Sequence, residues 1–98
     1  MKVVLDGSLM TDRNTVHDLL LEKLPLPAYY GRNLDALYDF LTACPDPLEI
    51  EVTNTSAMME LLGDYAQALL DTLRDACAEN PKVSMTIDDF LIKSKIST

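Results

Sequence analysis

The sequence predicts a small α/β domain in which helices flank one three-stranded parallel sheet. Three segments have the apolar pattern of short strands: residues 2–5, 48–52 and 83–87. Two stretches with helical periodicity separate each strand from the next, which gives the order β-α-α-β-α-α-β. Helical crossovers make the strands parallel. The 98 residues provide for one domain with one core.

The first predicted strand covers residues 2–5, Lys-Val-Val-Leu, and ends in a turn at Asp6-Gly7. Three consecutive apolar residues are typical of a strand that is covered on both faces. We therefore expect this strand to lie in the centre of the sheet.

Two helices are expected between the first and second strands. The first has apolar residues at helical spacing up to Leu24 and ends at Pro25 and Pro27, because proline lacks a backbone donor and disfavours helix just before it. Three residues can cap its start: Thr11, Asp12 and Asn14. The second helix begins at Asn33, a good N-cap, and has an apolar stripe made of Leu34, Leu37, Tyr38 and Leu41.

The second strand alternates apolar and polar residues, which is typical of a half-exposed strand. After it, Ser56 can cap a short helix that stops at Gly63, and Asp64 can cap a longer helix that ends at Asn80-Pro81. The third strand alternates in the same way. The apolar face of the longer helix is formed by Ala66, Leu69, Leu70, Leu73 and Cys77.

The charge balance indicates which partners suit this chain. It has 8 Lys and Arg against 16 Asp and Glu, a formal net charge of −8. Because phosphate and carboxylate repel each other, this charge argues against binding to nucleic acid or to an anionic membrane. A basic partner is the natural complement.

Compartment and domain boundaries follow from simple patterns. No apolar run approaches the ~20 residues of a membrane-spanning helix, and the first one stops at Asp6, so we expect a cytoplasmic protein without a signal peptide.

Cys44 and Cys77 have no disulfide or metal-ligand spacing, so we expect both to be small buried hydrophobic side chains. We also expect no metal and no cofactor. We expect residues 1–89 to form the domain, with 90–98 as a C-terminal extension.

Acidic residues are concentrated in the middle of the chain. Residues 33–79 contain ten acids and one base, Arg74, and such a run is usually a solvated face. On the second helix, however, Asp35, Asp39 and Thr42 fall within about 60° of one another at 100° per residue. Two exposed carboxylates at this spacing repel each other slightly but match a cationic site. Tyr29-Tyr30-Gly31 comes just before them, as packing or recognition residues.

Residues 26–42, Leu-Pro-Ala-Tyr-Tyr-Gly-Arg-Asn-Leu-Asp-Ala-Leu-Tyr-Asp-Phe-Leu-Thr, resemble the hallmark stretch of the barstar family of intracellular ribonuclease inhibitors. Weaker similarity covers about residues 2–88. The resemblance implies a three-stranded parallel sheet flanked by helices. It also implies an immunity protein, not an enzyme, that blocks a basic, barnase-like extracellular ribonuclease one-to-one, without nucleic acid, membrane, small-molecule substrate or cofactor.

The resemblance also implies roles for individual residues. Asp39 would enter the ribonuclease active site in place of an RNA phosphate, and Tyr29 would pack on the catalytic histidine. Asp35 would pair with a basic side chain at the rim, and Asp75 would reach an enzyme arginine. The remaining contact surface would come from Tyr30, Gly31, Asn33, Leu34, Tyr38 and Thr42.

The chain departs from the family pattern in three places. Tyr38 keeps the aromatic of the pattern but stands where barstar itself has tryptophan, and Asp75 is one methylene shorter than the glutamate it replaces. The connection at residues 43–47 is shorter and carries Pro45 and Pro47, while residues 89–98 extend beyond the family core. The rim of the partner is therefore expected to differ from that of barnase.

The functions of an enzyme and of a carrier protein fit these residues less well. An enzyme would use Asp35 and Asp39 as an acid–base pair, but one exposed helix face offers neither a cleft nor two different environments. A carrier protein would use Ser8 as its attachment site. However, Ser8 follows a strand, whereas such an attachment serine lies at the start of a helix in a helical bundle. His17 is expected to be a solvent-facing or boundary residue. The main alternative is a barstar-like module for a different basic toxin or a partner that is not a ribonuclease.

Overall fold

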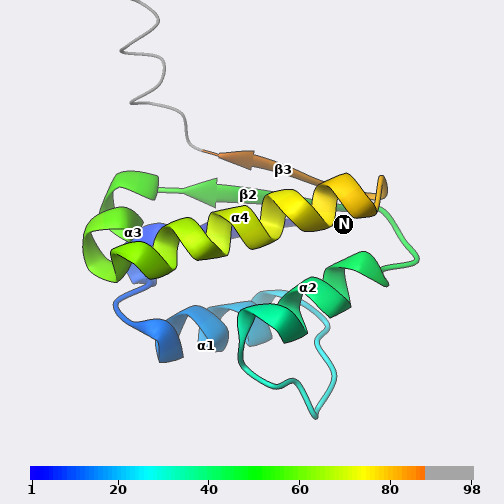
Figure 1. Ribbon diagram of the computed structural model, residues 1–98, viewed down its shortest axis with the longest axis horizontal. Helices are drawn as coiled ribbons and strands as arrows, with labels where there is room; N and C mark the ends of the chain where they lie inside the picture. The colour runs from blue at the N-terminus through cyan, green and yellow to red at the C-terminus, as the bar shows by residue number, and fades with distance from the viewer. Residues whose placement is uncertain (88–98) are drawn as a thin grey trace, which may run out of the picture.

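Three parallel strands form one sheet, as the sequence predicts (Figure 1), and the strand order across the sheet is β1-β2-β3. The computed structural model describes residues 1–87. The strands are β1 (Lys2–Asp6), β2 (Leu48–Thr53) and β3 (Val83–Ile87). In the register of the sheet, Val3 lies beside Ile50 and Ile50 beside Met85, so the inward-facing apolar residues form rows across it.

Four α-helices connect the strands: α1 (Arg13–Lys23), α2 (Leu34–Thr42), α3 (Thr55–Leu62) and α4 (Asp64–Glu79). A short 3-10 helix, η1 (Gly7–Leu9), precedes α1. The predicted order β-α-α-β-α-α-β is confirmed. The predicted extension at 90–98 lies outside the described residues. None of the helices in residues 1–87 is both long and apolar enough to cross a membrane.

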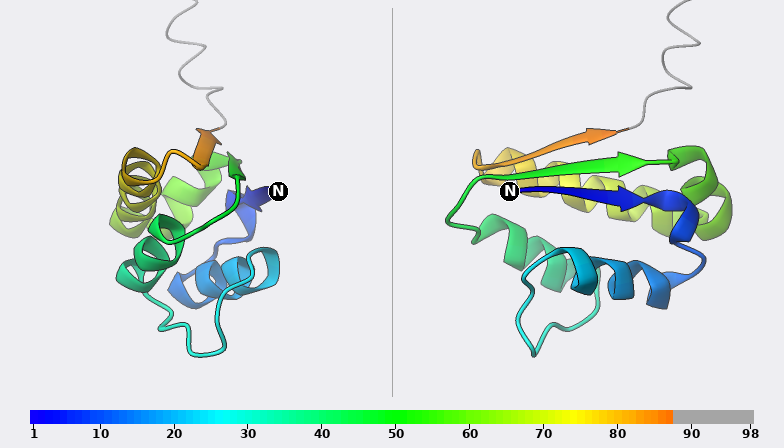
Figure 2. Two further views of the ribbon diagram at one scale, coloured as in Figure 1. Left: turned by 90° about the vertical axis from the view of Figure 1, so that its right-hand side faces the viewer. Right: turned by 180° about the vertical axis from the view of Figure 1, so that it is seen from behind.

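The prediction that β1 is central was wrong, because β2 lies between β1 and β3. The helices cover only one face of the sheet (Figure 2). Val3 and Leu5 point into the core, whereas Val4 is 43% exposed on the open face. On that face Lys2 forms an ion pair with Glu51 of β2 at 3.3 Å. Because Val4 is apolar although it is exposed, the sequence of β1 has the pattern of a strand that is covered on both faces, and this pattern led to the wrong prediction.

Local hydrogen bonds fix where the helices begin. Asp12 caps α1 and forms a capping box with Thr15. The side chain of Asn33 accepts the backbone N–H of Ala36 at 2.7 Å, as expected for the N-cap of α2. The predicted N-caps of α3 and α4 lie two residues and one residue, respectively, too far toward the C-terminus. Asn54 and Gly63, both with positive φ, precede α3 and α4, so Ser56 and Asp64 are helical residues.

Helix α2 is anchored at both ends over the core. Leu37 and Leu41 are fully buried, and α2 packs against α4. At the end of α2, the buried side-chain amide of Asn80 donates to the carbonyl oxygens of Leu41 and Cys44, each at 3.0 Å. The outer face of α2 is therefore presented by a fixed element.

Candidate functional site

The outer face of α2 carries two exposed carboxylates. Asp35 lies in the first turn, where the helix dipole favours a negative charge, and Asp39 follows one turn later. In residues 1–87 the ion pairs involve Lys2, Arg32 and Arg74, and none of them includes Asp35 or Asp39. These two carboxylates are therefore not neutralised by a basic side chain of the described part of the chain.

Helix α4 adds two more carboxylates beside α2. The pKa of the Tyr38 phenol is raised, first by partial burial and then by the charges of Glu79, Asp75 and Asp39. Tyr38, which the sequence predicted in the apolar stripe of this helix, therefore lies within reach of acids from both helices. We call Asp35, Tyr38, Asp39, Asp75 and Glu79 the acidic surface.

Glu79 is a member of the acidic surface that sequence reasoning missed. It follows Asp75 by four residues, so the two carboxylates lie one turn apart on the same side of α4. This spacing was visible in the sequence. Only the packing of α4 against α2 shows that it matters, because it brings the charge of Glu79 to Tyr38.

The two tyrosines before α2 point in opposite directions. Tyr29 is 88% exposed, whereas Tyr30 is 9% exposed and packs in the core. The hydroxyl of Tyr30 lies 2.7 Å from Nδ1 of His17. Recognition therefore suits Tyr29, and the role of Tyr30 in this structure is to hold the loop.

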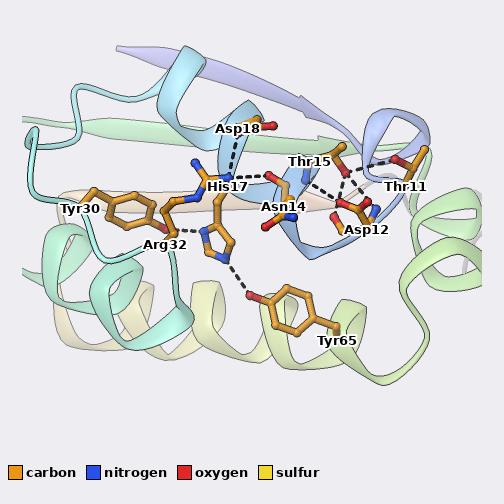
Figure 3. Close-up of polar contacts among 9 residues, drawn as sticks. All are labelled: Thr11, Asp12, Asn14, Thr15, His17, Asp18, Tyr30, Arg32 and Tyr65. Atoms are coloured by element: carbon orange, nitrogen blue, oxygen red, sulfur yellow. Dashed lines mark hydrogen bonds and ion pairs between the residues drawn. The ribbon is translucent and has the colours of Figure 1, made fainter.

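His17 is the centre of a buried polar cluster, so the prediction of a solvent-facing or boundary residue was wrong. It is 2% exposed, and Nε2 lies 2.7 Å from the hydroxyl of Tyr65 on α4 (Figure 3). The guanidinium of Arg13 covers the ring of Tyr65 at 4.6 Å. Sequence reasoning missed this cluster because its two tyrosines come from other elements, 13 and 48 residues away.

Arg32 ties the loop before α2 to α1. Its guanidinium donates to the carbonyl oxygen of Asn14 at 3.0 Å and forms an ion pair with Asp18 at 2.8 Å (Figure 3). Burial raises the pKa of the Tyr30 phenol to about 12, so that hydroxyl stays protonated and able to hydrogen-bond at neutral pH. The loop before α2 is thus held to α1 by Arg32 and by the hydrogen bond between Tyr30 and His17.

The other residues assigned to the surface have mixed positions. Gly31 and Asn33 are exposed, Leu34 and Thr42 are half-buried, and Asp75 is exposed. The hydroxyl of Thr42 donates to the carbonyl oxygen of Tyr38 at 2.9 Å, which leaves the methyl group and an acceptor for contact.

A groove adjoins Asp39 on the side of α2 away from α4. It has a volume of about 870 Å³ and lies between the loop at residues 25–31, α2 and the connection at 43–47. Tyr29, Tyr30, Gly31 and Asp39 line it. The structure therefore brings four of the predicted site residues to one hollow, and Tyr38 and Asp75 to the opposite side of α2.

The remaining candidates for chemistry are metal-ligating side chains, the two thiols and Ser8. Residues 1–87 contain no group of three or more His, Cys, Asp or Glu that could hold a metal ion. Burial raises the pKa of the half-buried thiols of Cys44 and Cys77, which makes them poor nucleophiles. The hydroxyl of Ser8 donates to Asp6 at 2.7 Å within η1.

We expect the free energy of unfolding to fall as the pH falls from about 7 to 5. Burial, and next the charge of Arg32, lower the pKa of His17 against the opposing effect of Asp18, so the unfolded chain binds the proton first below about pH 6.5. Tyr30 and Tyr65, which face the ring, stay neutral in this range because their pKa values are raised. Urea denaturation at several pH values measures the effect. His17→Gln should show a much smaller pH dependence in this window, and an equal dependence in both proteins would contradict the assignment.

Comparison with known proteins identifies the family that this chain resembles. A family model described as "Barstar (barnase inhibitor)" matches residues 1–89. A protein of Bacillus subtilis (strain 168) named "Putative ribonuclease inhibitor YrdF" is 40% identical to this chain over 79 residues, which cover 80% of this chain and 87% of that protein.

Proposed function

Because this chain belongs to the barstar family, we propose that it is a protein inhibitor of a ribonuclease. The observation that carries the mechanism is the pair of exposed carboxylates on α2, Asp35 and Asp39, with no intramolecular ion pair in residues 1–87 and with the exposed Tyr29 beside them. The inhibitor places the acidic surface in the active site of the enzyme and excludes RNA from it.

The physical basis of the proposal is mimicry of phosphate. A ribonuclease must gather cationic side chains to hold the RNA backbone, and carboxylates accept the same charge-assisted hydrogen bonds as phosphate oxygens. A fixed helix presents its carboxylates without the entropy cost of ordering a flexible segment. The anchoring of α2 by Asn80 and the capping by Asn33 support this role.

Individual residues take distinct parts in the proposed complex. Asp39 enters the active site, Tyr29 packs on the catalytic histidine, and Asp35 pairs with a base at the rim. Asp75 and Glu79 extend the acidic surface toward outer cations of the enzyme. Tyr30 acts indirectly, by holding the loop through His17.

The proposed partner is a basic, barnase-like extracellular ribonuclease bound one-to-one, and the inhibitor protects the cytoplasm of the producing cell. No catalytic activity, cofactor, nucleic acid, membrane or small-molecule substrate is part of the proposal. The second candidate is a different basic toxin or a basic partner that is not a ribonuclease, which the same acidic surface also suits.

An inhibition assay tests the proposed function. Purified barnase and other basic secreted ribonucleases are titrated with the protein while cleavage of a fluorogenic RNA is followed. Loss of activity that is complete at one equivalent supports the proposal. Undiminished cleavage by every enzyme, together with retention of another basic protein on an affinity column, would favour the second candidate.

We expect the association rate with an inhibited ribonuclease to fall at least about tenfold between low salt and 0.5 M NaCl, because salt screens the attraction between opposite charges. The dissociation rate should change much less. Stopped-flow fluorescence over a series of salt concentrations measures both rates. An association rate independent of salt would contradict electrostatic steering by the acidic surface.

A further inference from the structure

The groove beside Asp39 is apolar over most of its surface and is open to solvent. Residues of the loop at 25–31, of α2 and of the connection at 43–47 form its walls. Its volume of about 870 Å³ is within the range of small-molecule pockets, which is about 300–1,000 Å³, so it has room for large apolar side chains. The apolar lining is formed largely by Pro25, Pro27, Phe40, Ala43, Pro45 and Pro47.

We propose that this groove receives an apolar loop of the same ribonuclease whose active site Asp39 enters, and that it thereby decides which ribonucleases the protein inhibits. This inference rests on the proposed function and identifies a second recognition site for it. The occupant carries one or two large apolar side chains with basic residues beside them.

The first argument is the continuity of the groove with the acidic surface. Asp39 lies at the boundary between two sides of α2. Tyr38 faces α4 on one side, whereas Phe40 and Ala43 line the groove on the other. Tyr29 also lines the groove. An enzyme that surrounds Asp39 must therefore cover the mouth of the groove as well.

The second argument is that the groove is rigid before binding. Four of the five prolines of the chain line it. One wall is held by Arg32, which binds Asp18. The opposite wall is held by Lys82, which donates to the carbonyl oxygen of Pro45 at 2.7 Å, and by Asn80. A preformed apolar groove binds an apolar side chain at low entropy cost.

The third argument concerns the charge of the occupant. The charged side chains that line the groove are Asp39 and Asp46, and no lysine or arginine of residues 1–87 lines it. The N-terminal ammonium of Met1, which also lines the groove, donates to the carbonyl oxygen of Pro47 at 3.1 Å. Two carboxylates at the margin of an apolar hollow suit an apolar segment with flanking bases. Such a segment matches a basic ribonuclease better than a second copy of this acidic chain.

One wall of the groove lies outside the acidic surface. It is the connection at residues 43–47, which carries two prolines. All five of its residues line the groove. This wall of the groove therefore determines which ribonucleases the protein inhibits, while Asp39 engages the cationic site that such enzymes share.

The substitution Ala43→Trp tests the proposal, because it fills part of the groove without changing a charge or a residue of the acidic surface. Ser56→Trp, exposed on α3 at the other end of the sheet, is the matched control. Both variants are first compared with the wild type by thermal unfolding. Their Kd values are then measured with barnase and with each secreted ribonuclease that the wild type inhibits.

For a ribonuclease that uses the groove, Ala43→Trp should raise Kd at least about tenfold, at low and high salt alike, and Ser56→Trp should leave Kd within about twofold. The heat-capacity change of binding should become less negative with Ala43→Trp, because less apolar surface is buried. A rise in Kd that does not depend on salt, together with a less negative heat-capacity change, indicates lost apolar contact and not altered charge.

Two results would overturn the inference and leave the proposed function intact. One is equal inhibition of every such ribonuclease by the wild type and Ala43→Trp. The other is self-association of the wild type that Ala43→Trp abolishes without loss of inhibition, which would make a second copy the occupant. If the wild type inhibits no ribonuclease, the proposed function fails and this inference fails with it.

Discussion

Replacing Asp39 with alanine is expected to weaken binding to the inhibited ribonuclease by at least about 2–5 kcal/mol. This is the range for removing one partner of a buried, hydrogen-bonded charge pair, since the cations of the enzyme are left desolvated and unpaired. In the free protein Asp39 is exposed and forms no ion pair within residues 1–87, so its removal should cost little stability. Isothermal titration calorimetry measures the loss.

The matched control is Glu60→Ala, which removes the same charge from an exposed position on α3. Its effect on the binding free energy should stay below about 0.5 kcal/mol at moderate salt, because it lies outside the acidic surface. A loss below about 1 kcal/mol for Asp39→Ala would contradict the assignment of Asp39 to the active site of the enzyme.

Replacing Asn80 with leucine is expected to lower the free energy of unfolding by about 2–4 kcal/mol. The amide of Asn80 donates to the carbonyl oxygens of Leu41 and Cys44, and its oxygen accepts the N–H of Lys82 at 3.1 Å. Leucine has nearly the same size but leaves these backbone groups without their partner, and a buried unsatisfied group costs about 1–3 kcal/mol. Guanidinium denaturation measures the loss.

Lys82→Ala provides the comparison for Asn80→Leu. Lys82 donates to the carbonyl oxygen of Pro45, in the same connection, but from an exposed position where water can replace it. Its loss should stay within about 0.5 kcal/mol. Similar losses in the two variants would show that the burial of the Asn80 hydrogen bonds does not stabilise the end of α2.

Much of the fold could be predicted because local signals and packing agree. Asn33 is followed by an amphipathic stretch, and the expected cap hydrogen bond to Ala36 is present. Alternation in β2 and β3 placed Ile50 in the core and Glu49 outside it. The exposed positions of Asp35 and Asp39 followed from the helical period alone.

Features that depend on distant contacts could not be predicted. His17 is buried only because Tyr30 and Tyr65 reach it from the loop and from α4. The edge position of β1 depends on which strands pair, because β2 lies between β1 and β3, and its apolar run does not reveal that pairing. Glu79 acquires its place only when α4 packs against α2.

The central claim is that the carboxylates of α2 occupy the site where the ribonuclease holds phosphate. Competition with an active-site mononucleotide, measured by titrating an inhibited ribonuclease with this protein at increasing nucleotide concentrations, tests that claim most directly. We predict that the apparent Kd rises linearly with nucleotide concentration, because bound nucleotide lowers the fraction of enzyme whose active site is free. An apparent Kd that stays constant while the nucleotide saturates the enzyme would contradict the claim.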